Sequence, residues 1–182
     1  MTRGKRSLPV VETTVTYLEM RERPKRPRAP APFGRLAILR AHKPTISFYR
    51  YLYNTVGESW NWTDRRLLTD EELAAIIHDP KVEIYVLYAD GVPAGYAELD
   101  LRPEEEIELV YLGLIPEFVG RGLGQFLLDW AIETAWARTP RRLWAHTCTL
   151  DHPRALSTYQ KAGFVPYMQQ VEKVVPLSAL PR

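Results

Sequence analysis

The sequence predicts an α/β fold, namely a single domain with a mixed, mostly antiparallel central sheet and flanking helices. The chain has 182 residues, which suits one domain, and 46% of them are hydrophobic, which suits a buried core. Its patterns run in the order of two strands, two helices, a meander of three strands, and then helix, strand, helix, strand. This order lacks the regular strand–helix alternation of a dinucleotide-binding domain.

The front of the chain is expected to contain a flexible end, two strands and a basic loop. Residues 1–9 are assigned to the flexible end, and residues 10–182 to the domain. Residues 11–20 and 34–41 have the alternation of strands. The segment between them, 21–32, holds four prolines and five basic residues, and we expect a loop because proline blocks helices and lacks a backbone donor.

Two helices are predicted next. Ile46, Tyr49, Leu52 and Tyr53 fall on one helical face, and Gly57 provides a stop. The second helix begins with the capping box of Thr69 and Glu72 and ends near Asp79 and Pro80.

A three-stranded meander follows the helices. Residues 82–89 and 92–100 flank Asp90-Gly91, which is typical of a tight hairpin turn. Residues 106–115 are predicted to form the third strand.

The remaining chain alternates between helices and strands. Residues 122–137 carry apolar side chains at every fourth position and predict a helix. Residues 141–150 predict a strand, and residues 153–162 a short helix that starts with Pro153 and stops at Gly163. Residues 164–175 supply the last strand.

Composition argues against several classes of protein. The single Cys148 excludes an internal disulfide framework, and four dispersed histidines argue against a metal site. No apolar run approaches the roughly 18 residues that span a bilayer, so no membrane association is expected. The basic start of the chain has no apolar signal core, which favours a cytoplasmic location.

The formal net charge of +2 is unevenly distributed. Residues 1–30 contain eight Lys and Arg against three Glu, so the remainder of the chain is acidic on balance. A basic front segment is weak support for nucleic-acid binding by the domain itself, and we do not expect a nucleic-acid partner.

The most informative segment is the strand, turn and helix over residues 112–136. Gly120, Gly122 and Gly124 let the backbone approach a ligand closely. The free N–H groups at the start of the helix attract an anion such as a pyrophosphate, and Arg121 adds a charge. The spacing fits neither a P-loop nor a dinucleotide fingerprint. The alternative is a turn that only joins a strand to a helix.

This segment resembles motif A, Q/R-x-x-G-x-G/A, of the GNAT superfamily of acyl-CoA-dependent N-acyltransferases. Gly122 and Gly124 occupy the two small positions, and Val119 stands where the family usually has Gln or Arg. Residues 151–167 resemble motif B, in which His152 replaces the usual Asn. The motif B positions that match are Ala155, Tyr159, Gly163 and Phe164.

The resemblance implies direct transfer of an acetyl group from acetyl-CoA to a primary amine within a ternary complex. The acceptor would be a small molecule or a peptide, and the family also includes homodimers. The residues implied in binding acetyl-CoA are Leu112, Leu114, Val119, Gly120, Arg121, Gly122, Leu123, Gly124 and His152. A non-catalytic CoA-binding or regulatory module on the same fold is the alternative.

Two residues are candidates for catalysis. The resemblance implies that Tyr159 donates a proton to the leaving thiolate, since a phenol stays protonated at neutral pH. It also implies that Glu108 is the base, and strand periodicity predicts that Glu108 shares a face with Leu112 and Leu114. A packing role for the tyrosine and a solvated acidic strand end are the alternatives. Glu98 and Asp100 are reserve bases.

The acceptor is left open. The aromatic residues Tyr49, Tyr53, Trp60 and Trp62 either shape its pocket or pack in the core. The acidic stretch 104–108 favours a cationic amine, whereas the basic front segment favours an anionic partner. Cys148 is expected to be a buried, inert thiol rather than a nucleophile.

Overall fold

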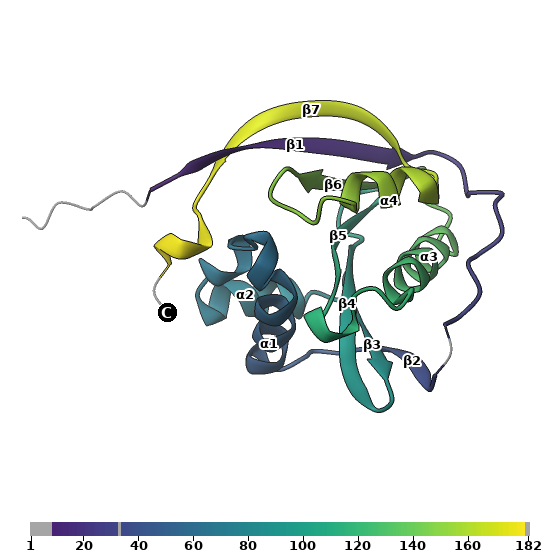
Figure 1. Cartoon of the computed structure of the whole chain (residues 1–182), viewed down its shortest axis with the longest axis horizontal. Coiled ribbons are helices and arrows are strands. Elements are labelled where there is room, and N and C mark those ends of the chain that lie inside the picture. The colour runs from purple at the N-terminus through teal and green to yellow at the C-terminus, as the bar shows by residue number, and fades with distance from the viewer. Residues whose placement is uncertain (1–8, 33, 181–182) are drawn as a thin grey trace, which may run out of the picture.

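The computed structural model of the chain describes residues 9–32 and 34–180. One seven-stranded sheet has the order β2-β3-β4-β5-β6-β1-β7 (Figure 1). Every neighbouring pair is antiparallel except β5 and β6, which are parallel. The strands are β1 Val11–Met20, β2 Leu36–Arg40, β3 Val82–Ala89, β4 Val92–Asp100, β5 Glu106–Leu114, β6 Arg142–Cys148 and β7 Val165–Val174. The predicted fold class is confirmed.

Helices cover both faces of the sheet. The helices are α1 Ile46–Gly57, α2 Asp70–Ile77, α3 Leu123–Trp136 and α4 Ala155–Ala162. Two apolar clusters make the core: one lies under α1 and α2 and includes Leu52 and Leu73, and the other lies under α3 and α4 and includes Leu127 and Ala162. None of the helices in the described residues is long and apolar enough to span a membrane.

Local sequence features explain where most helices begin and end. The Thr69 hydroxyl accepts a hydrogen bond from Glu72 N–H, and the Glu72 carboxylate accepts one from Thr69 N–H, so the capping box is present. Gly163 ends α4 with a φ of 110°. The predicted start at Pro153 is wrong, because the helix begins at Ala155. Residues 152–155 form a turn instead, in which the carbonyl of His152 accepts a hydrogen bond from Ala155 N–H.

The position of β1 follows from no local pattern. This strand lies between β6 and β7 and is antiparallel to both, so Val15 pairs with Cys148 on one side and with Gln170 on the other. Together β1 and β7 form a long curved ribbon that arches over one end of the molecule (Figure 1). The first and last strands of the chain are therefore neighbours.

A β-bulge lies in the middle of β5. Glu98 of β4 pairs with Tyr111, and the next residue, Leu99, pairs with Leu109, so Val110 has no partner on β4. An extra residue reverses the alternation of side chains beyond it. Leu109 and Leu112 consequently pack on the same side of the sheet, against α3 and α4. The expectation that Glu108 shares a face with Leu112 and Leu114 is wrong for this reason.

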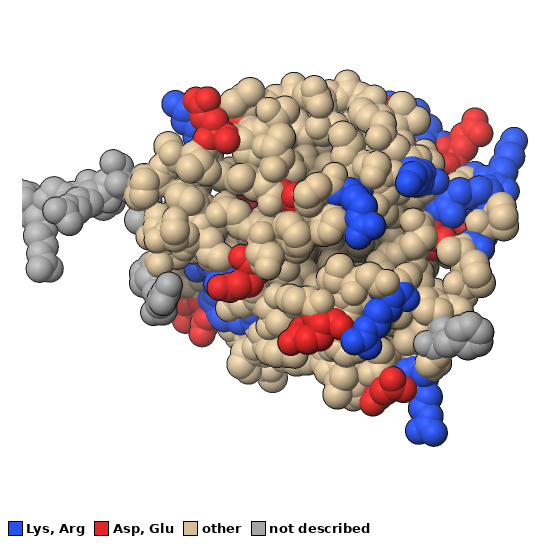
Figure 2. Space-filling view, viewed as in Figure 1, with Lys and Arg blue, Asp and Glu red and all other residues tan. Residues whose placement is uncertain are grey.

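The basic segment 21–32 is a loop without helix or strand, as predicted. It runs beside α3, where Arg26 forms an ion pair with Asp129 and where Arg23 and Arg28 both contact Glu133. Figure 2 shows Lys and Arg side chains gathered on the edge where this loop runs. Its charge is thus partly neutralised by the domain. Most of the predicted flexible end, residues 1–8, lies outside the described residues.

Candidate functional site

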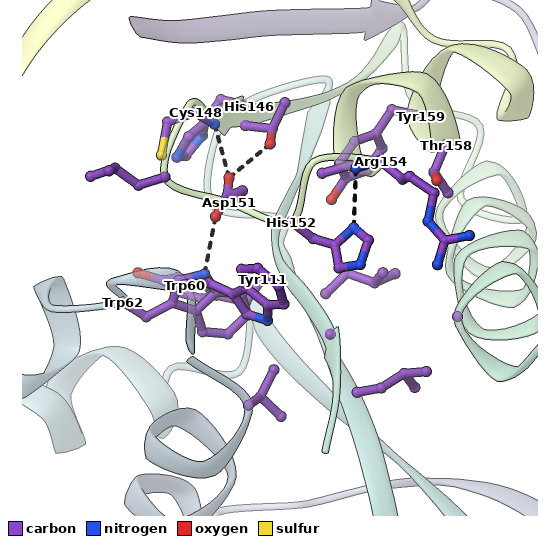
Figure 3. Close-up of a pocket in the computed structure, with 18 of the residues that line it drawn as sticks. Trp60, Trp62, Tyr111, His146, Cys148, Asp151, His152, Arg154, Thr158 and Tyr159 are labelled. Carbon is purple, nitrogen blue, oxygen red and sulfur yellow. Dashed lines mark hydrogen bonds between the residues drawn. The ribbon is translucent and has the colours of Figure 1, made fainter. Parts of the chain in front are cut away.

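A cavity of about 560 Å³ opens where β5 and β6 separate. The two strands pair from Glu106 and Arg142 only as far as Leu109 and Ala145, although both continue further. One end of the cavity is formed by the glycine turn and α4, and the other end by β1, β6, β7 and the loop after α1 (Figure 3).

The glycine turn forms the first end of the cavity. Gly120 and Gly122 have φ values of 86° and 78°, a conformation that favours glycine. Gly120, Gly122 and Gly124 line the cavity, and α3 begins directly after Gly122. Because the first N–H groups of a helix lack partners within the helix, this turn has the features of an anion site.

The other residues implied in acetyl-CoA binding are divided between cavity and core. Leu112, Leu114, Val119 and His152 line the cavity. Leu123 is only 3% exposed and packs in the core, so its side chain does not reach the cavity. Arg121 is not among the lining residues, and its guanidinium lies 5.3 Å from the centre of the Phe118 ring.

His152 supports the turn that leads into α4. Its Nδ1 accepts a hydrogen bond of 3.1 Å from Arg154 N–H, and its ring lies 4.9 Å from that of Trp60 (Figure 3). An imidazole nitrogen can accept a backbone hydrogen bond as an Asn side-chain oxygen does. The replacement of Asn in motif B therefore keeps an acceptor at this position.

Tyr159 points into the cavity from α4. Its ring packs edge-to-face against Phe164, and the side chain is 9% exposed. Among the described residues, no hydrogen bond engages its hydroxyl. Burial, and to a smaller extent the charge of Asp151, raises the pKa of Tyr159 above its usual value. The phenol therefore stays protonated and available as a donor.

Glu108 and His146 form a pair beside the cavity. Glu108 Oε1 lies 3.3 Å from His146 Nδ1. Of the two, His146 lines the cavity and Glu108 does not. The pKa of His146 is raised, chiefly by the Glu108 carboxylate next to it. Periodicity along a single strand could not place this pair, because the pair depends on the register between β5 and β6.

The reserve bases lie away from the cavity. Glu98 is completely buried and accepts hydrogen bonds from Tyr49 Oη at 2.5 Å and Arg65 Nη2 at 2.7 Å. Asp100 is paired with Arg102. Neither carboxylate belongs to the lining of the cavity.

Asp151 connects the two walls at the second end of the cavity. Its carboxylate accepts hydrogen bonds from Trp62 Nε1 at 3.3 Å, Thr147 Oγ1 at 2.7 Å and Cys148 N–H at 2.8 Å (Figure 3). Sequence analysis did not identify this residue, although it directly precedes His152 in motif B. Burial raises the pKa of the Cys148 thiol, in agreement with an unreactive side chain.

The aromatic residues of the α1 region include both core residues and residues of the cavity wall, the two alternatives that the sequence left open. Tyr49 is a core residue with no exposed surface. Trp60 and Trp62 line the cavity, and Tyr53, although 1% exposed, also reaches its wall. Tyr53 packs edge-to-face on Tyr111 of β5, with the ring centres 5.1 Å apart.

Charges of opposite sign occupy the two ends of the cavity. Arg154 and Lys161, at α4, lie at the end with the glycine turn. Asp64, Asp151 and Glu172 lie at the end formed by β1, β7 and the loop after α1. This division suits a ligand with an anionic part at one end and a cationic part at the other.

Comparison with known families gives a match over most of the domain. The model of the acetyltransferase (GNAT) family matches residues 42–164, which contain the glycine turn, the bulged strand and α4. The matched region is about two thirds of the chain.

Solved structures share the fold. The ribosomal-protein-S18-alanine N-acetyltransferase from Escherichia coli superposes with a TM-score of 0.60 at 16% identity, over 74% of this chain and 80% of that one. An aminoglycoside acetyltransferase from an uncultured soil metagenomic sample gives a TM-score of 0.56 at 19% identity, over 71% and 91%. A functionally unknown conserved protein from Staphylococcus epidermidis gives 0.58 at 14%, over 90% of this chain but 62% of that one.

Proposed function

This chain belongs to the acetyltransferase (GNAT) family, and from that premise we propose that it transfers an acetyl group from acetyl-CoA directly to a primary amine. The observation that carries the proposal is the shared cavity, in which a glycine turn with positive φ angles opens on the same space as Tyr159. In this proposal the glycine turn binds the donor, and the phenol of Tyr159 supplies the proton for the leaving group.

The residues at the glycine-turn end suit acetyl-CoA. The backbone of residues 119–124 would bind the pyrophosphate, since the position of a Cβ atom on Gly120 is open and the first turn of α3 presents N–H groups. Arg154 and Lys161 add positive charge. Leu112 and Leu114 would lie along the pantetheine arm, and His152 would support the turn that leads into α4.

The proposed reaction forms one bond and breaks one. The neutral amine attacks the thioester carbonyl, so the C–N bond forms, and collapse of the tetrahedral intermediate breaks the C–S bond. Tyr159 gives its proton to the departing thiolate and regains one from the nitrogen through solvent. The base proposed from the family resemblance is Glu108, which lies beside the cavity in contact with His146.

The acceptor is proposed to be a cationic amine on a small molecule or a peptide. Asp64, Asp151 and Glu172 attract a positive charge at the end where the acceptor would enter. Trp60 adds an aromatic surface on which a cation can pack. A cytoplasmic location and a homodimer remain predictions from the sequence.

The test is a panel of amines incubated with acetyl-CoA, with release of free thiol as the measurement. We expect turnover with amines that carry a further positive charge, and micromolar binding of acetyl-CoA by calorimetry. Binding without thiol release for any amine would favour the non-catalytic CoA-binding module. Absence of both heat and thermal stabilisation with acetyl-CoA would refute the proposed function.

A further inference from the structure

We propose that His146 takes the proton from the acceptor amine and that Glu108 is a positioning residue which holds the His146 imidazole. This inference rests on the proposed function and assigns a different residue as its base. It starts from the bulge in β5, which separates Glu108 from Leu112 and Leu114.

Access to the cavity distinguishes the two residues. The Glu108 side chain is 15% exposed, whereas the His146 side chain is 39% exposed and lines the cavity. His146 lies on β6 just beyond Ala145, the last residue of that strand that pairs with β5. An amine in the cavity therefore meets the imidazole before it can reach the carboxylate.

The contact between the two residues selects a tautomer. Glu108 Oε1 lies 3.3 Å from Nδ1, so the carboxylate favours a proton on that nitrogen. In a neutral imidazole the other nitrogen, Nε2, then carries the lone pair. Among the described residues, the contact with Glu108 is the only polar contact of the His146 ring, so Nε2 is left to accept a proton from a ligand.

Several charged or titratable groups surround the imidazole. Glu108 lies on β5, and Asp151 and Asp64 contribute from the loops at the second end of the cavity. The Tyr17 ring of β1 lies 5.7 Å from the imidazole, and its hydroxyl donates to Glu172 of β7. These carboxylates stabilise the protonated imidazole, which makes His146 a stronger base than an isolated histidine.

The proton transfers balance. The acceptor enters as an ammonium ion and gives one proton to His146 Nε2, so the imidazole becomes cationic and Glu108 stabilises it. The free lone pair of the nitrogen then attacks the thioester carbonyl. The nitrogen loses a second proton as the intermediate collapses, and one proton in total ends on the CoA thiol while the other reaches solvent.

The test compares Glu108→Gln and His146→Gln in the dependence of kcat/KM on pH. In the wild type, activity should rise through a pKa above the usual histidine value of about 6.5. Glu108→Gln should keep this rise but move it to lower pH, because the imidazole loses its carboxylate. His146→Gln should abolish the rise and lower kcat/KM by about 100-fold or more, the size of a general-base contribution.

The opposite result identifies Glu108 as the base itself. In that case Glu108→Gln abolishes the rise with pH and His146→Gln retains it, which overturns the inference while the proposed function stands. Exposed His42 provides the control, since His42→Gln should leave the profile unchanged. If wild-type protein turns over no amine, the proposed function has failed first.

A second measurement is independent of turnover and of how well His146→Gln folds. Titration of the His146 ring by NMR should give a pKa above 6.5 that falls in Glu108→Gln. An imidazole pKa at or below the usual value, or one that Glu108→Gln leaves unchanged, overturns the inference.

Discussion

The two ends of the cavity are built in different ways. The glycine-turn end is built around consecutive residues, 119–124, and the helix that they start, with α4 beside them. The other end is assembled from β1, the loop after α1, β6 and β7, and its walls meet through the hydrogen bonds of Asp151 to Trp62 and Thr147. One end depends on local backbone conformation, and the other on tertiary contacts.

This difference indicates how each end responds to change. A backbone site tolerates variation of side chains, which is consistent with Val119 in place of the family's Gln or Arg. It does not tolerate a change at a glycine whose φ is positive. A site made of distant side chains can instead vary one residue at a time, and it is where we expect the specificity for the acceptor to lie.

Gly122→Glu should give the largest effect, at the local end. Its φ of 78° disfavours any side chain, and a carboxylate there would repel the pyrophosphate. We expect the affinity for acetyl-CoA to fall by about 100-fold or more, measured by calorimetry. Gly91→Glu is the matched control, since Gly91 has a φ of 87° but lies in the turn between β3 and β4. An unchanged affinity in Gly122→Glu would remove the donor from this turn.

Tyr159→Phe, at a residue that lies between the two ends of the cavity, should have an intermediate effect. The change removes only the hydroxyl, so we expect kcat to fall by about 100-fold through loss of the general acid. The affinity for acetyl-CoA should change less than twofold. Tyr51→Phe, at an exposed position of α1, is the control. Wild-type turnover in Tyr159→Phe would leave this residue with a packing role.

Trp62→Phe should give the smallest effect, confined to the assembled end. It removes the hydrogen bond from Trp62 Nε1 to Asp151 but keeps an aromatic ring. A typical hydrogen bond contributes about 1 kcal/mol, and this one is long at 3.3 Å, so we expect the KM of the amine to rise a few-fold and the affinity for acetyl-CoA to stay constant. Trp136→Phe, which loses an indole contact to Met20 far from the cavity, should change neither. If the KM of the amine and the Kd of acetyl-CoA rose by the same factor, the two ends of the cavity would not act separately.

Features set by neighbouring residues could be predicted from the sequence. The capping box of Thr69, the turn at Asp90 and Gly91 and the glycine turn all appear where their local patterns place them. The end of α4 at Gly163 follows from the same kind of information.

Features set by distant contacts could not be predicted. The bulge at Val110 arises from pairing with β4, and nothing in the alternation of β5 itself indicates it. It displaced Glu108 from the face expected for it. The insertion of β1 between β6 and β7, and with it the contribution of Thr13 and Tyr17 to the cavity wall, likewise depends on pairing across the whole chain.

The position of β1 in the sheet also imposes an order on how the protein folds during its synthesis. A ribosome synthesises this strand long before its partners β6 and β7. Until β6 and β7 have been synthesised, β1 has no neighbouring strand to pair with. The later pairing is slow, because closing so long a loop costs entropy. The assembled end of the cavity is therefore completed last, and the nascent chain acquires its donor turn before it acquires a closed pocket for the acceptor.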